Sequence, residues 1–87
     1  MIDLKRVREI VNEHVRIAVG EIEEKEPMIT FAVRDKLFSA KEAWRVNVRY
    51  TPKSKEEGLR WERVALFKID AETGEVLEFK EGWTWTL

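Results

Sequence analysis

The first part of the chain carries apolar residues at the three- and four-residue spacing of an amphipathic helix. The residues at this spacing are Leu4, Val7, Val11, Val15 and Ala18. Such positions lie on one side of a helix and favour packing of that side against a core. Asp3 stands where a side chain can cap the first turn, and Gly20 stands where a left-handed residue ends helices. The pattern therefore predicts one helix over residues 4–19.

After Pro27 the period changes from about four residues to two. In AWRVNVRY the apolar side holds Trp44, Val46, Val48 and Tyr50, and the polar side holds Arg45, Asn47 and Arg49. Strict alternation is typical of a half-buried antiparallel strand. The preceding ITFAV alternates in the same way, so Ile29, Phe31 and Val33 are expected to share one side of a first strand.

Two more strands are predicted in the second half of the chain. LRWERVALFKID places Trp61, Ala65, Phe67 and Ile69 on one side, and EVLEFKEGWTWTL does so with Leu77, Phe79, Trp83, Trp85 and Leu87. The charged TPKSKEEG is expected to be a loop. DAETG is expected to be a hairpin turn with Gly74 in the left-handed conformation, which keeps odd residues opposite odd residues.

The fold class that follows is α+β: one N-terminal helix packed on a four-stranded antiparallel sheet, as a single domain over residues 1–87. Side-chain matching predicts a register that opposes Tyr50 to Trp61 and Trp44 to Phe67. The same register brings Arg49 near Glu62, while the last hairpin brings Phe67 near Leu77 or Phe79 and Arg63 near Glu81.

An aromatic row is expected along one end of the inner sheet face. Its members are Tyr50, Trp61, Trp83 and Trp85. A helix of this length spans about 24 Å, whereas strands of ten residues run to roughly 33 Å, so the helix hardly covers the whole face. Because Trp and Tyr are frequent at contact hot spots, these four residues form a predicted interaction patch. The alternative, that the row is plain core, stays open.

Composition narrows the classes of partner and compartment. The net charge is −1, which gives no bulk electrostatic case for nucleic acid or an anionic membrane. Cysteine is absent, so there is no disulfide or thiolate metal site. No apolar run approaches the roughly 20 residues of a membrane span, and the N-terminus does not read as a signal peptide. We expect a cytoplasmic protein. Its many Glu, Lys and Arg residues and lack of Gln are thermophile-like.

Two stretches resemble the PepSY family. WRVNVRY resembles the aromatic-x-Val-x-Val strand of that family, and ALFKIDAETGEVLEF is similar to its strand, Asp-x-x-Thr-Gly turn and Glu-Val-Leu restart. The resemblance covers most of the chain. It implies a cystatin-like helix across an antiparallel sheet and a role in binding or inhibition. It carries no catalytic residues to this chain.

No catalytic, cofactor or metal site is predicted. His14 is the only histidine and has no second histidine or cysteine to share a metal. The two serines, Ser39 and Ser54, stand in charged turns without the context of a nucleophile. In DAETG, Gly74 is the fifth residue and no loop of twelve residues follows, so a hairpin turn is preferred to a calcium loop.

A basic stripe on the outer sheet face is a candidate site for RNA. It would hold Arg45, Asn47, Arg49, Lys68 and Lys80. Sheets that bind RNA interleave such residues with exposed aromatic rings, whereas here the aromatic residues are expected on the other face and Glu62 and Glu78 interrupt the charge. A solvated face without nucleic acid is therefore predicted.

The function expected from the sequence is that of a small non-catalytic interaction module rather than an enzyme. It is expected to self-associate as a dimer, or to bind another protein, through the aromatic patch. The alternative is a binder of an apolar small ligand or peptide in a cleft between helix and sheet.

Overall fold

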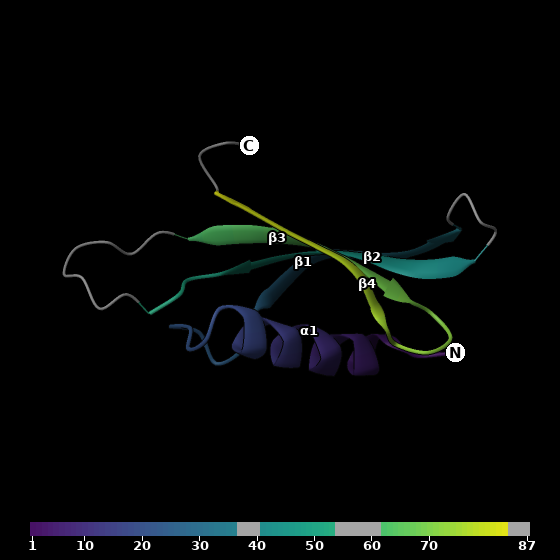
Figure 1. The fold of residues 1–87 in the computed structure, drawn as a ribbon, viewed down its shortest axis with the longest axis horizontal. Coiled ribbons are helices and arrows are strands. Elements are labelled where there is room, and N and C mark those ends of the chain that lie inside the picture. Colours follow the sequence, from purple (N-terminus) through teal and green to yellow (C-terminus); the bar gives the residue numbers. More distant parts are fainter. Residues whose placement is uncertain (37–40, 54–61, 84–87) are drawn as a thin grey trace.

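A computed structural model describes residues 1–36, 41–53 and 62–83 of the chain. It contains one helix, α1 (Leu4–Ala18), and four strands: β1 (Met28–Lys36), β2 (Glu42–Tyr50), β3 (Arg63–Asp70) and β4 (Val76–Trp83). The strands form one antiparallel sheet in the order β1-β2-β3-β4. The helix lies against one side of this twisted sheet (Figure 1). The α+β prediction, with its N-terminal helix, is confirmed.

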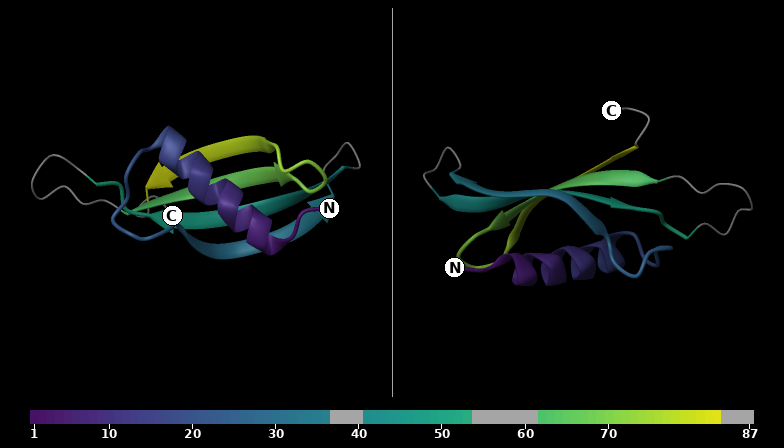
Figure 2. Two further views of the ribbon diagram at one scale, coloured as in Figure 1. Left: turned by 90° about the horizontal axis from the view of Figure 1, so that it is seen from below. Right: turned by 180° about the vertical axis from the view of Figure 1, so that it is seen from behind.

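The ends of α1 are fixed by the two residues that the sequence singled out. The Asp3 carboxylate accepts a hydrogen bond from the backbone N–H of Arg6 at 2.9 Å, which satisfies one of the unpaired donors of the first turn. At the other end Gly20 has a φ of +97°, and its N–H donates to the carbonyl of Arg16 at 3.1 Å. Between these caps the helix crosses the sheet diagonally (Figure 2).

The core lies between α1 and the sheet. The helix contributes Val7, Ile10, Val11 and Val15. The central strands contribute Val46, Val48, Tyr50, Ala65, Phe67 and Ile69, and the same cluster includes Ile22. His14 lies at the margin of this core, where its ring meets Phe67 at 5.4 Å and Phe79 at 4.9 Å between centroids. His14 is thus a boundary residue that packs on aromatic rings.

The turn between β3 and β4 has Gly74 in the predicted left-handed conformation, but Ile69 pairs with Val76 beside it, so odd residues do not oppose odd residues there. The Asp70 carboxylate accepts hydrogen bonds from the backbone N–H groups of Glu72 and Thr73 at 2.8 and 3.1 Å. These donors favour the charged carboxylate and hold the pKa of Asp70 below its usual range. Gly74 closes the turn with a φ of +80°, and its N–H donates to the carbonyl of Asp70 at 2.9 Å.

The register of β2 and β3 differs from the predicted one by two residues. Tyr50 lies opposite Arg63 rather than Trp61, and Trp44 lies opposite Ile69 rather than Phe67. A shift of two residues leaves every side chain on the same face, so the alternation of the sequence could not distinguish the two registers.

Three of the predicted side-chain pairings are present. Arg49 Nε donates to Glu62 Oε1 at 3.0 Å, here as a diagonal rather than a direct pair. Arg63 donates to the Glu81 carboxylate at 2.9 Å. Phe67 lies directly opposite Phe79, with ring centroids 4.9 Å apart.

A bulge in β1 contradicts the prediction that Ile29, Phe31 and Val33 share one side of the first strand. The register shifts between Ile29 and Phe31, so Thr30 is an extra residue with no counterpart on β2. One extra residue reverses the alternation beyond it. Ile29 therefore packs on the core, while Phe31 and Val33 pair with the outer residues of β2. The three residues do not share a face.

A second bulge, in β4, makes the predicted inward position of Leu77 wrong. The register shifts where Lys68 pairs with Glu78 and Ile69 pairs with Val76, which leaves Leu77 as the extra residue. Val76 packs against the core and Leu77 is exposed. The sequence pattern had placed Leu77 inward because its alternation assumed an unbroken strand.

Candidate interaction face

The structure describes only part of the predicted aromatic patch. Tyr50 is a core residue with 0% of its surface exposed, so it offers nothing for a partner to touch. Trp61 and Trp85 lie outside the described residues, as does the side chain of Trp83, whose backbone pairs with Arg63. The contact role of the three tryptophans therefore stays a prediction.

Tyr50 is held in the core by a polar cluster at the end of the sheet. Its hydroxyl donates to Glu81 Oε2 at 2.5 Å, and Arg63 donates to the other oxygen of the same carboxylate at 2.9 Å. Burial, and next the hydrogen bond to Glu81, raise the pKa of Tyr50 well above its ordinary value. The phenol is thus a neutral structural donor.

The sheet face opposite α1 is not covered by any described element (Figure 1). The strand register arranges this open face in three rows that run across the strands. The first row is Met28, Arg49, Val64 and Gly82; the second is Phe31, Asn47, Leu66 and Lys80; the third is Val33, Arg45, Lys68 and Glu78. The open face therefore draws side chains from all four strands.

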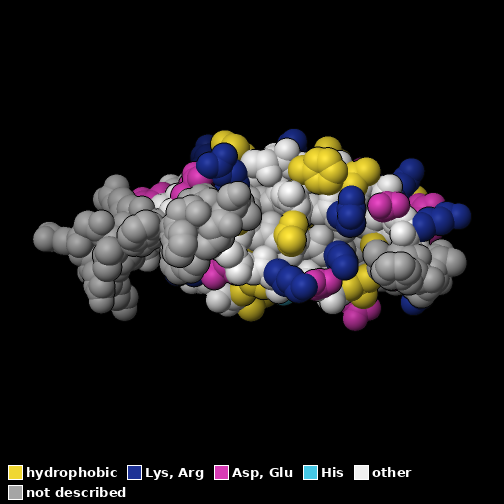
Figure 3. Space-filling view, turned by 90° about the horizontal axis from the view of Figure 1, so that it is seen from above, with side chains coloured by type: hydrophobic (Ala, Val, Ile, Leu, Met, Phe, Trp, Pro, Cys, Tyr) yellow, Lys and Arg dark blue, Asp and Glu magenta, His cyan; other side chains and the backbone are white. Residues whose placement is uncertain are grey.

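The first two rows contain an apolar band, defined here as Met28, Phe31, Val64 and Leu66. The exposed fractions are 61% for Met28, 47% for Phe31 and 51% for Leu66. Figure 3, which looks onto this face, shows apolar side chains among Lys and Arg side chains. Large apolar groups that gather on one exposed face mark interaction sites more often than scattered ones do.

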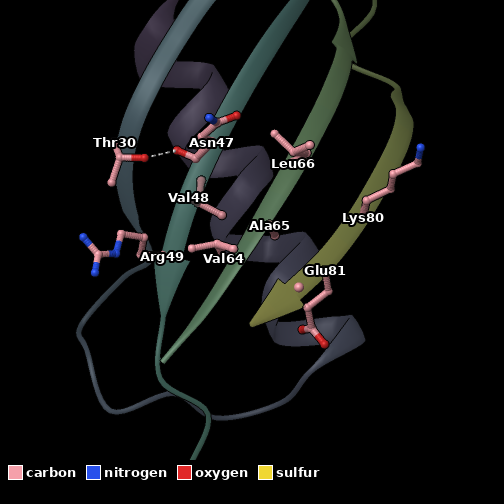
Figure 4. Close-up of a pocket in the computed structure, with 10 residues that line it drawn as sticks. Thr30, Asn47, Val48, Arg49, Val64, Ala65, Leu66, Lys80 and Glu81 are labelled. Carbon is pink, nitrogen blue, oxygen red and sulfur yellow. Dashed lines mark hydrogen bonds between the residues drawn. The ribbon is translucent and has the colours of Figure 1, made fainter. Parts of the chain in front are cut away.

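A groove of about 680 Å³ lies along this face. Asn47, Val64, Leu66 and Gly82 are among the residues that line it, and α1 lies behind the sheet in the close-up (Figure 4). Gly82 leaves the β4 end of the first row without a side chain, which keeps the face hollow there. On the β1 side, Thr30 Oγ1 donates to the carbonyl of Asn47 at 3.2 Å.

The cations of the open face have carboxylate partners. Arg49 pairs with Glu62, Arg45 with Asp35 at 3.8 Å, and Lys68 and Lys80 each with Glu78 at 3.0 Å. The hydrogen bond from Lys68, and next that from Lys80, lower the pKa of Glu78. The face is thus a mosaic of paired charges around the apolar band.

One premise about this face was wrong. The aromatic residues were expected on the opposite side of the sheet, yet the β1 bulge turns Phe31 onto the open face. No sequence signal marks this bulge. A signal for the rest of the band was present in VALF, where Val64 and Leu66 interrupt the alternation with apolar residues, as in a strand that is covered on both faces.

Other features of the described ranges bear on chemistry and location. Among residues 1–36, 41–53 and 62–83, no group of three or more His, Cys, Asp and Glu side chains is placed to hold a metal ion. In the same part of the chain, no helix combines the length and apolar character needed to cross a membrane.

Comparisons of the chain with family models, with curated proteins and with solved structures found no match. The PepSY-like resemblance of the two stretches therefore stays a prediction.

Proposed function

We propose that this chain is a non-catalytic interaction module that self-associates, and that the open face is the contact surface between two copies. The observation that carries the proposal is the one-sided sheet. Its inner face is filled by α1, whereas its outer face carries the apolar band, of which Val64 and Leu66 line the groove. Burial of such a band against an apolar surface is favourable at about 25 cal/mol per Å².

The size of the face fits a small dimer. Four strands about 4.8 Å apart and eight residues long at about 3.3 Å per residue give a face on the order of 500 Å². Two such faces together bury on the order of 1,000 Å², which is the lower bound for a specific protein contact. A sheet packed on a sheet at about 10 Å is moreover a common way to complete a single layer.

The charges favour a second copy over nucleic acid. The chain has a net charge of −1, and the cations of the open face pair with Asp35, Glu62 and Glu78. A polyanion would have to displace these carboxylates. A second copy presents the same mixture of both signs, so the contact requires no excess charge on either side.

The test is the mass of the protein in solution, by sedimentation or light scattering over a range of concentrations. The chain is expected to be a dimer, and Phe31→Thr/Leu66→Thr is expected to be a folded monomer. Thr keeps the strand preference while it removes most of the apolar surface. Ile17→Thr is the matched control, since Ile17 is 77% exposed on α1, away from the open face. A wild-type monomer at the highest concentration would refute the proposal.

A labelled single-stranded oligouridine provides the counter-test. No binding is expected at physiological salt. Saturable binding that weakens steeply with salt and is lost in Phe31→Thr would replace self-association by nucleic-acid recognition as the function of the face.

The predicted tryptophan patch has its own test. If Trp83 and Trp85 contact the partner, Trp83→Ala/Trp85→Ala should be a folded monomer with native circular dichroism. If they are core, the variant should not fold, because two such truncations cost about 3–5 kcal/mol each. A variant that folds and keeps the wild-type mass in solution would contradict both interpretations.

The alternative function, a ligand cleft between helix and sheet, has no observation in its favour. Where α1 faces the sheet, the described side chains pack as a buried core that includes Val11, Val15 and Phe67. The PepSY-like resemblance, which implies binding without catalysis, is compatible with the proposed module.

A further inference from the structure

We infer that the two-fold axis of the dimer runs across the strands, over the paired residues Val48 and Ala65, so that the apolar band packs on its own copy. This inference rests on the proposed function and specifies its geometry. It follows from the placement of side chains in the three rows and from the signs of their charges.

Two copies that meet through the same sheet face are related by a two-fold axis in the plane between the sheets. With roughly aligned strands, that axis runs either along the strands or across them. These two arrangements bring different residues together. In the first, β1 of one copy lies over β4 of the other and β2 lies over β3. In the second, each strand lies over its own counterpart in the opposite direction.

The axis along the strands opposes unlike surfaces and like charges. It keeps each row over the same row, so Arg45 lies over the partner's Lys68. Phe31 then lies over the partner's Lys80. Two close contacts between cations, and the polar Asn47 placed over the partner's Leu66, make this arrangement a poor match.

The axis across the strands gives a matched contact. When it passes over Val48 and Ala65, the first row of one copy lies on the second row of the other. Val64 then lies over the partner's Leu66, and Met28 lies over the partner's Phe31. The apolar residues of β1 and of β3 are thus each buried against their own copies, while on β2, between them, Arg49 lies over the partner's Asn47.

The same axis also opposes charges of different sign. On β3, reflection about residue 65 relates position 68 to position 62, so Lys68 lies over the partner's Glu62. Within one copy these two residues are about 20 Å apart along an extended strand and cannot touch. Inside the chain they are paired with Glu78 and Arg49 instead.

A charge-swap cycle tests the contact between Lys68 and Glu62. Lys68→Glu and Glu62→Lys are each expected to raise the dissociation constant of the dimer on the order of tenfold, because each repeats its clash twice across the two-fold axis. The double variant is expected to recover most of this loss. Additive losses in the double variant would overturn the inferred axis, because only a contact between copies can couple two sites so far apart.

Cross-linking gives an independent test, because the chain has no cysteine of its own. Val64→Cys mixed with Leu66→Cys is expected to form a disulfide-linked heterodimer under mild oxidation. Phe31→Cys mixed with Lys80→Cys is the control, since those positions meet only if the axis runs along the strands. Mass spectrometry identifies which two variants are joined, and circular dichroism verifies that each is folded.

The outcomes separate this inference from the proposed function. A wild-type chain that is monomeric refutes both the proposed self-association and the inferred axis. A wild-type dimer that links Phe31→Cys to Lys80→Cys, or links neither mixture, retains self-association but overturns the axis across the strands. A dimer that links Val64→Cys to Leu66→Cys and shows recovery in the charge-swap double variant supports the arrangement.

Discussion

The two faces of the sheet use similar side chains for different purposes. Leu66 and Phe67 are neighbours on β3, yet Leu66 is 51% exposed and Phe67 is 1% exposed. Phe67 packs against His14 and Phe79, whereas Leu66 lies in the groove between Asn47 and Lys80. Hydrophobic character alone therefore does not reveal whether a residue stabilises the monomer. An apolar residue stabilises the single chain only where other parts of that chain cover it.

The largest effect expected from this comparison is in the stability of the monomer. Phe67→Ala should lower the free energy of unfolding by about 3–5 kcal/mol, because it leaves a cavity against α1. Leu66→Ala, one residue away, should lower it by less than about 0.5 kcal/mol in the monomer. Urea unfolding of both variants at a concentration that favours monomer makes the comparison. Equal losses would show that the open face is covered within one chain.

A smaller effect is expected at the turn that borders the covered face. Gly74→Val should cost about 2 kcal/mol, because a β-branched residue is strained at a φ of +80°. Its added Cβ would also stand 3.0 Å from Ile10 Cδ1 of the helix. Gly20→Val is the control, with a similar φ but nothing within 4 Å of the added atom. Thermal melts should rank Gly74→Val below Gly20→Val.

The polar cluster at the end of the covered face gives the next prediction. Tyr50→Phe should lower the free energy of unfolding by about 1.5 kcal/mol, since it removes a hydrogen bond to a carboxylate. Glu81→Gln keeps an acceptor of the same shape and serves as the comparison. A loss near zero in chemical denaturation would mean that the hydroxyl contributes no net stability.

The same tyrosine predicts a dependence on alkaline pH. The pKa of Tyr50 is raised in the folded chain, whereas in the unfolded chain it is about 10. The unfolded state therefore loses the proton first, so stability is complete below about pH 10 and falls as pH rises above it. Tyr50 is the only tyrosine, so phenolate absorbance reports it alone. In Tyr50→Phe, denaturation midpoints at about pH 9 and pH 11 should differ less than in the wild type.

The smallest effect is expected from the charges of the open face. Lys80→Ala should change the stability of the monomer by less than about 0.5 kcal/mol, because its pair with Glu78 is exposed to solvent. Added salt should reduce even that difference. A loss above about 1 kcal/mol in calorimetry would mean that the ion pairs of this face stabilise the chain itself.

The sequence was informative where one periodicity ran unbroken. The helix, its caps at Asp3 and Gly20, the turn at Gly74 and the alternating strand β2 follow from local spacing and are all present. The contact of Phe67 with Phe79 follows from the short hairpin that joins their strands and from matched side chains.

The sequence misled where one residue was inserted without a marker. Thr30 and Leu77 are bulge residues. Neither is a glycine, the residue whose presence in a strand often indicates a bulge. Because a single extra residue exchanges the two faces, Phe31 moved from the expected core to the open face. The register of β2 and β3 failed for a different reason, since a shift of two residues preserves every face.

The two bulges also bear on how large an assembly the chain can form. Both lie on the edge strands, β1 and β4, which carry the unpaired backbone groups of the described sheet. A flat edge strand can pair with the edge strand of another molecule, and repeated pairing of this kind produces fibres. A bulge twists the edge strand and so disfavours such pairing. A contact through a face about a two-fold axis is complete at two copies. With the open face as the proposed contact surface, concentrated solutions are expected to contain discrete dimers and no fibres.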